Sequence, residues 1–188
     1  GVLVIGRFEP HKNILALIQA MRHSSLPVTI AGYTHPHHQR YLEECRRQAG
    51  RGRNITIAPA ISHDKLVAAY QTARVHVLPS WFETTGLVSL EAALCGCNIV
   101  TTNRGFTRDY FGDLAWYCDP ARPESIREAI EAAYATPFRS ELRQRILTHY
   151  TWEKTAAATL AGYEKVLSGQ THRGERARAG ASLAEVSA

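Results

Sequence analysis

The sequence predicts an α/β fold in which a doubly wound parallel sheet of about six strands carries helices on both faces. Short β-branched runs alternate with longer helical patterns along the chain. Most of these runs are apolar throughout, which is typical of parallel strands that are covered on both sides. The chain has 188 residues, 45% of them hydrophobic and 21% charged, and this composition indicates one ordinary globular domain.

The elements follow one another in a regular order. The expected strands are residues 2–5, 27–31, 54–58, 75–79, 98–102 and 115–118. The expected helices lie near 12–22, 37–49, 63–73, 87–95 and 122–135, with two more at 138–148 and 152–167. Ser62 is placed as a helix N-cap, Pro123 suits a first helical turn, and Gly96 stands where a helix should stop.

The domain is expected to comprise residues 1–167. From Gln170 onward the chain has no aromatic residue and is rich in Arg, Gly and Ala, so residues 168–188 are expected to form a disordered tail. The chain lacks an initiator Met and opens directly on a strand, which favours a fragment of something longer.

Charge and cysteine content narrow the setting of the protein. Twenty-two Lys and Arg against 17 Asp and Glu leave a net charge of +5, which phosphate ligands or solubility alone would explain. The basic residues are spread over many elements, so no nucleic-acid partner is expected. Cys45, Cys95, Cys97 and Cys118 fit neither a disulfide scaffold nor a zinc ribbon, and a reduced, cytoplasmic compartment is expected. No apolar run approaches the roughly 18 residues of a membrane span.

The first candidate site is the segment that joins the first strand to the first helix. Arg7 and Lys12 stand beyond the carboxyl end of that strand, where open α/β sheets bind ligands. Two cations near a helix N-terminus suit an anionic ligand such as a pyrophosphate. The same two residues could equally be solvated charges in a surface loop. The segment lacks the GxGxxG pattern, so a dinucleotide site is not supported.

The second candidate site follows the strand at 75–79. Glu83 lies in a loop, Gly86 opens a helix, and Glu91 is the one acid of that otherwise apolar helix. A carboxylate in a buried helix needs hydrogen bonds or a charge partner, and its two oxygens could accept from the two hydroxyls of a ribose. Gly86 would let the backbone approach a ligand closely. The alternative is that Glu91 pairs with an arginine and Glu83 is solvent-exposed.

Two further clusters are expected to carry no chemistry. The run His35-Pro36-His37-His38 is expected to be a solvated surface and not a metal site. Cys95 and Cys97 have the wrong spacing for a CxxC redox pair and are expected to pack in the core and a loop. No DxD motif occurs, so no metal is expected.

The two acids carry a family resemblance. Glu83-x7-Glu91, inside PSWFETTGLVSLEAALCG, resembles the E-x7-E signature of retaining glycosyltransferases of family 4, or glycosyl transferases group 1. Gly6-Arg7 with Lys12 resembles the phosphate-binding segment of that family. The match runs from about Gly1 to Leu167. It implies the C-terminal, Rossmann-like half of a GT-B fold, which binds the nucleotide-sugar donor.

The resemblance implies a role for each matching residue. It places Arg7, Lys12 and Glu83 in catalysis, and Ala60, Ile61, Thr85, Gly86, Leu87 and Glu91 in substrate binding. Arg7 and Lys12 would neutralise the diphosphate, converging on the helix start at Gly86. Glu83 would contact the transferred sugar, and Glu91 the ribose. Backbone at Ala60 and Ile61 would meet the base. Thr84-Thr85 stands where an aromatic residue and glycine are common in the family.

The implied activity is transfer of a hexosyl group from a UDP- or GDP-sugar to an acceptor, with retention of configuration and without a cofactor. An acceptor-binding domain would precede Gly1, and the isolated fragment would be inactive. Expected partners include the inner face of the membrane as a peripheral contact, in polysaccharide or glycoconjugate synthesis. Two alternatives stay open: a non-catalytic nucleotide-binding α/β module, and a GT-B sugar-nucleotide epimerase.

Overall fold

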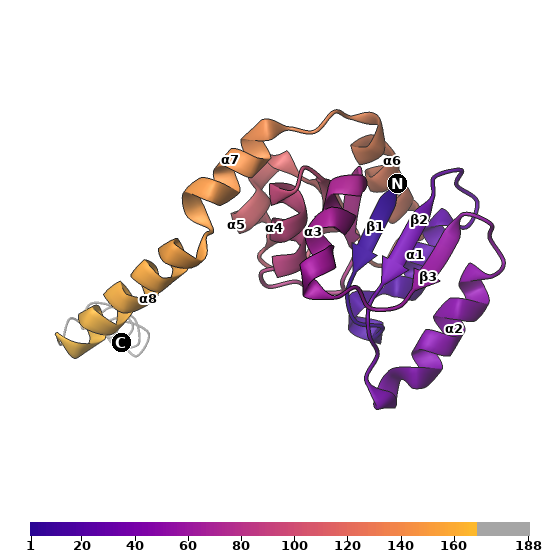
Figure 1. Ribbon diagram of the computed structural model, residues 1–188, viewed down its shortest axis with the longest axis horizontal. Helices are drawn as coiled ribbons and strands as arrows, with labels where there is room; N and C mark the ends of the chain where they lie inside the picture. The colour runs from indigo at the N-terminus through magenta and orange to yellow at the C-terminus, as the bar shows by residue number, and fades with distance from the viewer. Residues whose placement is uncertain (169–188) are drawn as a thin grey trace, which may run out of the picture. The chain divides into compact units, whose positions relative to one another are not determined.

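A computed structural model describes residues 1–168, and its central feature is one parallel sheet of six strands in the order β3-β2-β1-β4-β5-β6 (Figure 1). The strands are β1 Val2–Ile5, β2 Val28–Ala31, β3 Ile55–Ala58, β4 Val75–Leu78, β5 Asn98–Thr102 and β6 Trp116–Cys118. All five pairings are parallel. The predicted α/β class and strand number are confirmed, and each strand lies within one residue of its predicted bounds.

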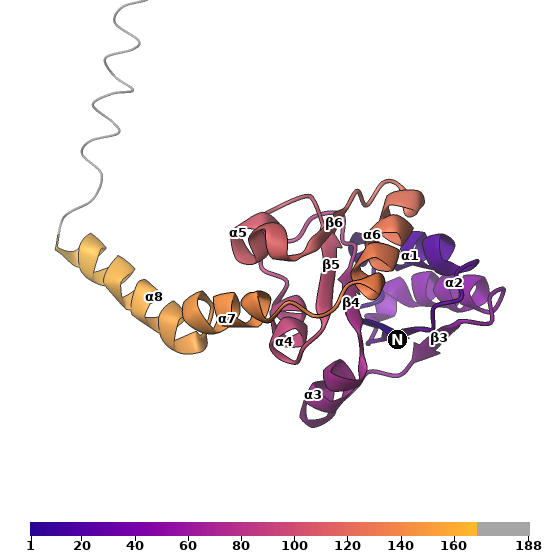
Figure 2. The ribbon, with the colours of Figure 1, turned by 90° about the horizontal axis from the view of Figure 1, so that it is seen from above.

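The helices occupy both faces of the sheet. Figure 2 shows α1, α2 and α6 on one face and α3 and α4 on the other. The α-helices are α1 Ile14–Met21, α2 Gln39–Ala49, α3 His63–Thr72, α4 Leu87–Leu94, α5 Thr107–Phe111, α6 Pro123–Ala135, α7 Ser140–His149 and α8 Trp152–Leu167. Three short 3-10 helices are η1 Pro10–Lys12, η2 Pro36–His38 and η3 Gly112–Leu114. Helices on both faces bury most of the sheet, which explains why its strands are apolar throughout.

Several helix boundaries differ from the sequence prediction. The helix expected at 12–22 begins at Ile14, because Asn13 has a left-handed backbone (φ 58°) that separates η1 from α1. Helix α5 was not predicted, since five residues are too few to show a helical period. Ser62 precedes α3 as expected, but its side chain makes no capping hydrogen bond. Gly96 has φ +100° and follows the end of α4, as predicted.

The described residues divide between two compact units. The first comprises Gly1–Thr148 and contains the whole sheet. The second begins at His149, and its described part is mainly α8, where the Thr151 hydroxyl accepts a hydrogen bond from the Lys154 N–H. The 1–167 domain boundary stays a prediction. Of the predicted tail, residues 169–188 lie outside the described residues.

The central strands of the sheet are more deeply buried than its edge. Strands β4 and β5 are buried along their whole length, whereas β3 at the edge is only partly buried. Helices α1 and α6 pack together over the sheet through residues such as Leu17, Ile18, Ile126 and Ile130, all of them buried. The central strands therefore hold their carboxyl ends in fixed positions.

Candidate functional site

The direction of the strand order reverses between β1 and β4. From β1 the chain builds outward through β2 and β3, and then returns to place β4 on the other side of β1. In open α/β sheets ligands bind at such a switch point, outside the carboxyl ends of the strands. The segment after β1 carries Lys12, and the segment after β4 carries Glu83. The two predicted segments therefore meet at one place, although they lie far apart in the sequence.

Lys12 and Glu83 form an ion pair at this switch point. The Lys12 Nζ lies 2.8 Å from Glu83 Oε2, and their side chains are only 15% and 10% exposed. The buried Ser80 hydroxyl donates to the same oxygen at 3.1 Å. Glu83 is thus buried, which excludes the alternative that it is a solvated loop residue. Two donors orient its carboxylate, and a positive charge stands beside it.

The backbone of Glu83 is fixed by the loop after β5. Glu83 and Gly105 form a parallel β-bridge, in which Glu83 N–H donates to the Arg104 carbonyl and Phe106 N–H donates to the Glu83 carbonyl. A Cβ on Gly105 would lie 2.1 Å from the Glu83 oxygen, and Gly105 has φ +100°. Only glycine permits this approach. The sequence prediction missed the role of Gly105, for which the one signal was a glycine between bulky residues just after a strand.

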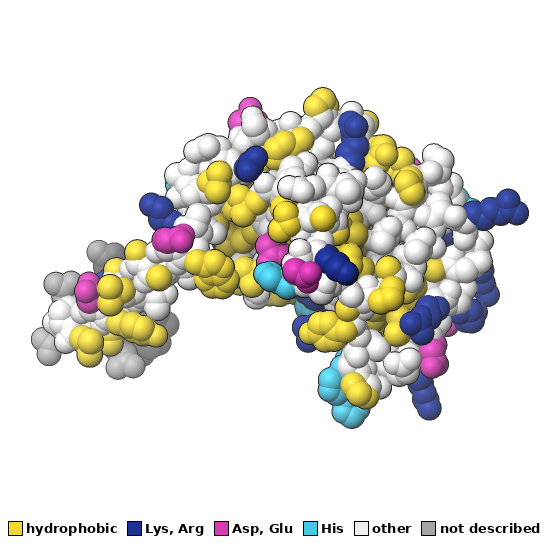
Figure 3. Space-filling view, in the orientation of Figure 1, with side chains coloured by type: hydrophobic (Ala, Val, Ile, Leu, Met, Phe, Trp, Pro, Cys, Tyr) yellow, Lys and Arg dark blue, Asp and Glu magenta, His cyan; other side chains and the backbone are white. Residues whose placement is uncertain are grey.

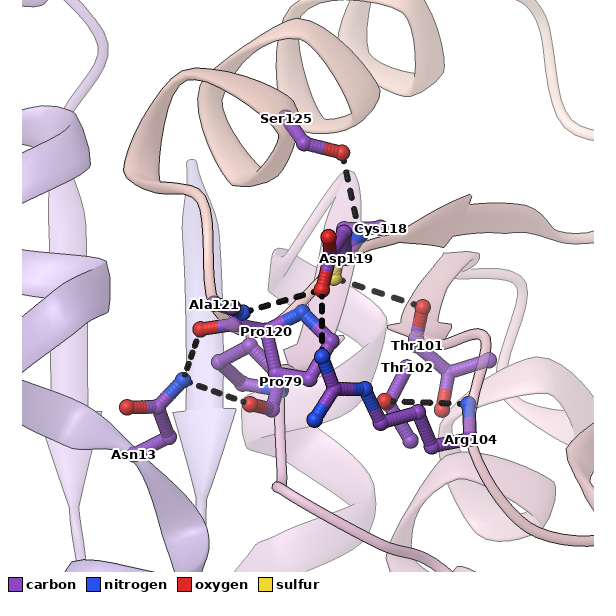
Figure 4. Close-up of polar contacts among 10 residues, drawn as sticks. All are labelled: Asn13, Pro79, Thr101, Thr102, Arg104, Cys118, Asp119, Pro120, Ala121 and Ser125. Carbon is purple, nitrogen blue, oxygen red and sulfur yellow. Dashed lines mark hydrogen bonds and ion pairs between the residues drawn. The ribbon is translucent and has the colours of Figure 1, made fainter.

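A second missed residue, Asn13, joins three of the carboxyl-end loops. Its Nδ2 donates to the carbonyl of Pro79 at 3.1 Å and to that of Pro120 at 2.8 Å (Figure 4). In the same group of loops, Arg104 Nη2 pairs with Asp119 Oδ1 at 3.0 Å. Polar bonds therefore link the segments after β1, β4, β5 and β6. Because Lys12 precedes Asn13 in the chain, these bonds also hold Lys12 at the switch point.

Helix α4 begins beside Glu83. Gly86 has φ +66° and precedes the first helical residue, Leu87. A Cβ on Gly86 would lie 3.4 Å from Glu83 Cγ, so the two residues are close neighbours. The first N–H groups of a helix have no acceptor within it, and they suit an anion. The hydroxyls of Thr85 and Tyr110 lie 3.3 Å apart, so a tyrosine from α5 stands next to this helix start.

Arg7 has a different environment from Lys12. Its Nη2 lies 3.0 Å from Glu9 Oε1, and its side chain is half exposed. The structure thus pairs each predicted phosphate-binding cation with an acid, Arg7 locally and Lys12 across the switch point. The convergence of Arg7 and Lys12 on one anion stays a prediction.

Glu91 lies in α4, as predicted, and is half-buried. Its Oε2 accepts a hydrogen bond of 3.3 Å from the hydroxyl of Tyr70 in α3. The sequence left open an arginine as its partner, and the structure supplies a phenol. The last two predicted residues, Ala60 and Ile61, lie in the loop between β3 and α3, where Ala60 is exposed and Ile61 half-buried.

The other sequence-derived candidates remain outside this site. His35 and His37 stack with ring centroids 4.8 Å apart, and both are exposed. Across residues 1–168, no group of three or more His, Cys, Asp or Glu side chains could hold a metal ion. Burial raises the pKa of Cys97 to about 12, and its thiol donates to the Tyr70 carbonyl, so it packs in the core as predicted. Lys and Arg side chains are spread over separate places on the face in Figure 3.

A parallel sheet of order 3-2-1-4-5-6 with helices on both faces defines a Rossmann-like α/β domain, and a charged pair lies at its switch point. The chain belongs to the glycosyl transferases group 1 family, and residues 2–148 match the sequence pattern of that family. It is 31% identical over 137 residues to a D-inositol 3-phosphate glycosyltransferase of Paenarthrobacter aurescens, covering 70% of this chain and 33% of that protein.

Solved structures show the same fold. A sucrose-phosphate synthase of Thermosynechococcus elongatus matches with a TM-score of 0.77 and 24% identity, over 89% of this chain and 46% of the other. HepE of Anabaena, in complex with UDP and glucose, matches with a TM-score of 0.70 and 19% identity, over 85% and 47%. The chain thus spans between a third and a half of each of these three proteins. Within residues 1–168, no helix has the length and apolar character to cross a membrane.

Proposed function

We propose that this chain is the C-terminal, donor-binding domain of a retaining glycosyltransferase that transfers a hexosyl group from a UDP- or GDP-sugar to an acceptor. The observation that carries the proposal is the Lys12–Glu83 pair at the switch point, beside the start of α4. Membership of the glycosyl transferases group 1 family supports the reaction class. The match to HepE, which was solved with UDP and glucose, supports a nucleoside diphosphate sugar as donor.

The leaving group sets the main electrostatic requirement. When the bond between sugar C1 and the phosphate oxygen breaks, its electron pair stays on the diphosphate, which gains negative charge. Fixed positive groups at that position lower the barrier, because they need no rearrangement during the reaction. The Lys12 ammonium would supply a full charge and the N-terminus of α4 about half of one. Arg7 would supply another after leaving Glu9.

The two acids would bind opposite ends of the donor. Glu83 would accept from a hydroxyl of the transferred sugar, once Lys12 turned toward the diphosphate. Glu91 would accept from the ribose hydroxyls, and backbone at Ala60 and Ile61 would meet the base. The sugar would rest against the backbone of Thr85, Gly86 and Leu87. Because Glu83 is held by Ser80 and by its bridge to Gly105, its carboxylate is oriented before the donor binds.

Activity of the whole protein requires an acceptor site. This chain spans 33% of the D-inositol 3-phosphate glycosyltransferase and 46% of the sucrose-phosphate synthase, and in the proposed enzyme a further domain would hold the acceptor. The isolated chain would then bind a donor nucleotide weakly and transfer no sugar.

Calorimetry with the 188-residue chain tests the donor site. UDP, GDP, uridine and heparin serve as probes. We expect one diphosphate to bind more tightly than uridine, and Lys12→Met to weaken that diphosphate by about tenfold or more, the scale of a hydrogen bond to a charged group. Lys154→Met, which removes an exposed cation from α8, is the matched control and should have little effect.

Two outcomes would refute the donor-site assignment. One is equal affinity for heparin and for both diphosphates, which would indicate a general polyanion surface. The other is an unchanged diphosphate affinity in folded Lys12→Met protein.

A further inference from the structure

Tyr70 and Glu91 come from two neighbouring helices that start at the same edge of the sheet. Helices α3 and α4 are in contact on one face, and each follows a strand from its carboxyl end. Side chains of a helix lean toward its N-terminus, so from Tyr70, in the last turn of α3, and from Glu91 the side chains lean in the direction of the carboxyl edge. The Tyr70 hydroxyl donates to Glu91 Oε2 at 3.3 Å, so the two helices are joined by a hydrogen bond to the acid of α4.

The position of Tyr70 is itself tightly fixed. The residue is 1% exposed. Its carbonyl accepts from the Cys97 thiol at 3.1 Å and from the Ala73 N–H at 3.0 Å. Its ring meets the buried His76 ring edge-on, with centroids 5.8 Å apart. These contacts leave the hydroxyl little freedom, so a long, flexible glutamate side chain is held by a rigid donor.

The phenol remains a donor throughout the physiological pH range. Burial is the main cause that raises the pKa of Tyr70, and the adjacent Glu91 carboxylate raises the pKa further. The O–H therefore stays protonated and donates to the Glu91 carboxylate. A carboxylate can accept about four hydrogen bonds, so one bond at Oε2 leaves capacity for two further donors. The cis-hydroxyls of a ribose are two donors at a suitable spacing.

We propose that Tyr70 is a positioning residue that holds the Glu91 carboxylate for the 2′- and 3′-hydroxyls of the bound nucleotide. The pair then makes the chain prefer ribonucleotides over 2′-deoxyribonucleotides. This inference rests on the proposed donor site. It adds that the preference for ribose depends on a residue that touches no part of the donor.

The experiment compares UDP or GDP, whichever binds better, with its 2′-deoxy form, by calorimetry on the 188-residue chain. The readout is the ratio of the two dissociation constants. We expect the wild type to favour the ribonucleotide, and Tyr70→Phe to reduce the ratio by about three- to tenfold, the range of one typical hydrogen bond, because the phenol acts on the ribose only through Glu91. Glu91→Gln should lower the ratio as well. Affinity for the deoxynucleotide should fall less in Tyr70→Phe, because only its 3′-hydroxyl can bond to Glu91.

Tyr41→Phe is the matched control. Tyr41 is a partly buried tyrosine in α2, and its hydroxyl accepts from the Leu15 N–H on the opposite face of the sheet. Its loss should leave the ratio unchanged. A general loosening of the fold would lower both affinities together, whereas a positioning role moves their ratio.

The outcomes separate the two proposals. If neither diphosphate binds to the wild type, the donor site fails and the inference with it. If Glu91→Gln abolishes the preference but folded Tyr70→Phe keeps it, the donor site stands and the role of Tyr70 is wrong. If Tyr70→Phe does not fold, uniform 3-fluorotyrosine in the wild-type chain tests the same bond. Its more acidic phenol must shift the ratio, and an unchanged ratio would overturn the inference.

Discussion

Two regions at the carboxyl edge of the sheet differ in how they are built. The switch-point region, residues 6–13, 79–86 and 103–106, is joined by an ion pair, a β-bridge and the two bonds of Asn13. The base-side region, residues 59–67, makes fewer such bonds: Ser62 does not cap its helix, Ala60 is exposed, and Val67 is 53% exposed. The first follows buried central strands, and the second follows an edge strand.

The difference teaches which part of the proposed donor needs a rigid site. Charge that develops during a reaction is stabilised by groups that are already in place, so the diphosphate and the sugar need the rigid region. A base that serves as a handle can bind to a looser surface through backbone groups. We therefore expect substitutions in the switch-point region to have much larger effects than similar ones in the base-side region.

The largest effect is expected for Gly105→Ala. The new Cβ would lie 2.1 Å from the Glu83 carbonyl oxygen, at a φ of +100°. Gly96→Ala is the matched control, because Gly96 has the same φ with no atom within 4 Å of the added Cβ. Urea unfolding should give a loss of about 1–2 kcal/mol for the control and about 3 kcal/mol or more for Gly105→Ala, which adds overpacking to the strain. Equal losses would mean that the bridge to Glu83 does not constrain the loop.

The second-largest effect is expected for the Lys12–Glu83 ion pair. Lys12→Met leaves the Glu83 carboxylate without its cation. We expect a loss of about 2–3 kcal/mol in the free energy of unfolding, less than the roughly 3–5 kcal/mol of a fully buried pair, because the two side chains keep 15% and 10% exposure. Adding Glu83→Gln removes the uncompensated charge and should recover part of that loss. The double-mutant cycle, measured by denaturant unfolding at pH 7, gives the coupling. Strictly additive losses would show that the two side chains do not interact in solution.

A third prediction concerns pH. Burial lowers the pKa of His76 to about 3, from an ordinary value near 6.5. Between these values the unfolded chain binds a proton that the folded chain does not, so the stability that depends on neutral His76 is complete above pH 6.5 and falls as the pH drops. We expect wild type to lose about 2 kcal/mol more than His76→Gln between pH 7.5 and pH 5. Parallel pH profiles of the two proteins would contradict it.

The smallest effect should come from the base-side region. Ser62→Ala in the base-side region and Ser89→Ala in α4 remove the same hydroxyl group. The buried Ser89 hydroxyl lies 3.3 Å from His76 Nδ1, and its loss should cost about 1–2 kcal/mol. Ser62 makes no capping bond, so its change should stay within about 0.5 kcal/mol. Thermal unfolding measures the stability loss of each variant. Equal losses would show that Ser62 caps α3 in solution.

Some features of the fold and the site could be predicted from local sequence. The apolar runs predicted all six strands. The residues after the fourth strand predicted that Glu83 lies in a loop and Glu91 in a helix. These features depend on neighbouring residues, because burial on two faces and helix capping leave a short-range pattern. The predicted start of α1 was wrong because the left-handed backbone of Asn13 has no apolar signature.

Other features depended on the tertiary structure. The sequence by itself determined that cations follow the first strand and acids follow the fourth. Only the placing of β4 beside β1 decided that Lys12 meets Glu83, while Arg7 turns to its neighbour Glu9. The same holds for Tyr70, which reaches Glu91 from another helix, and for Gly105, whose missing side chain makes room for Glu83. The physical reason is that strand order and loop contacts are set by packing summed over the whole sheet, and that sum leaves no pattern within any one segment.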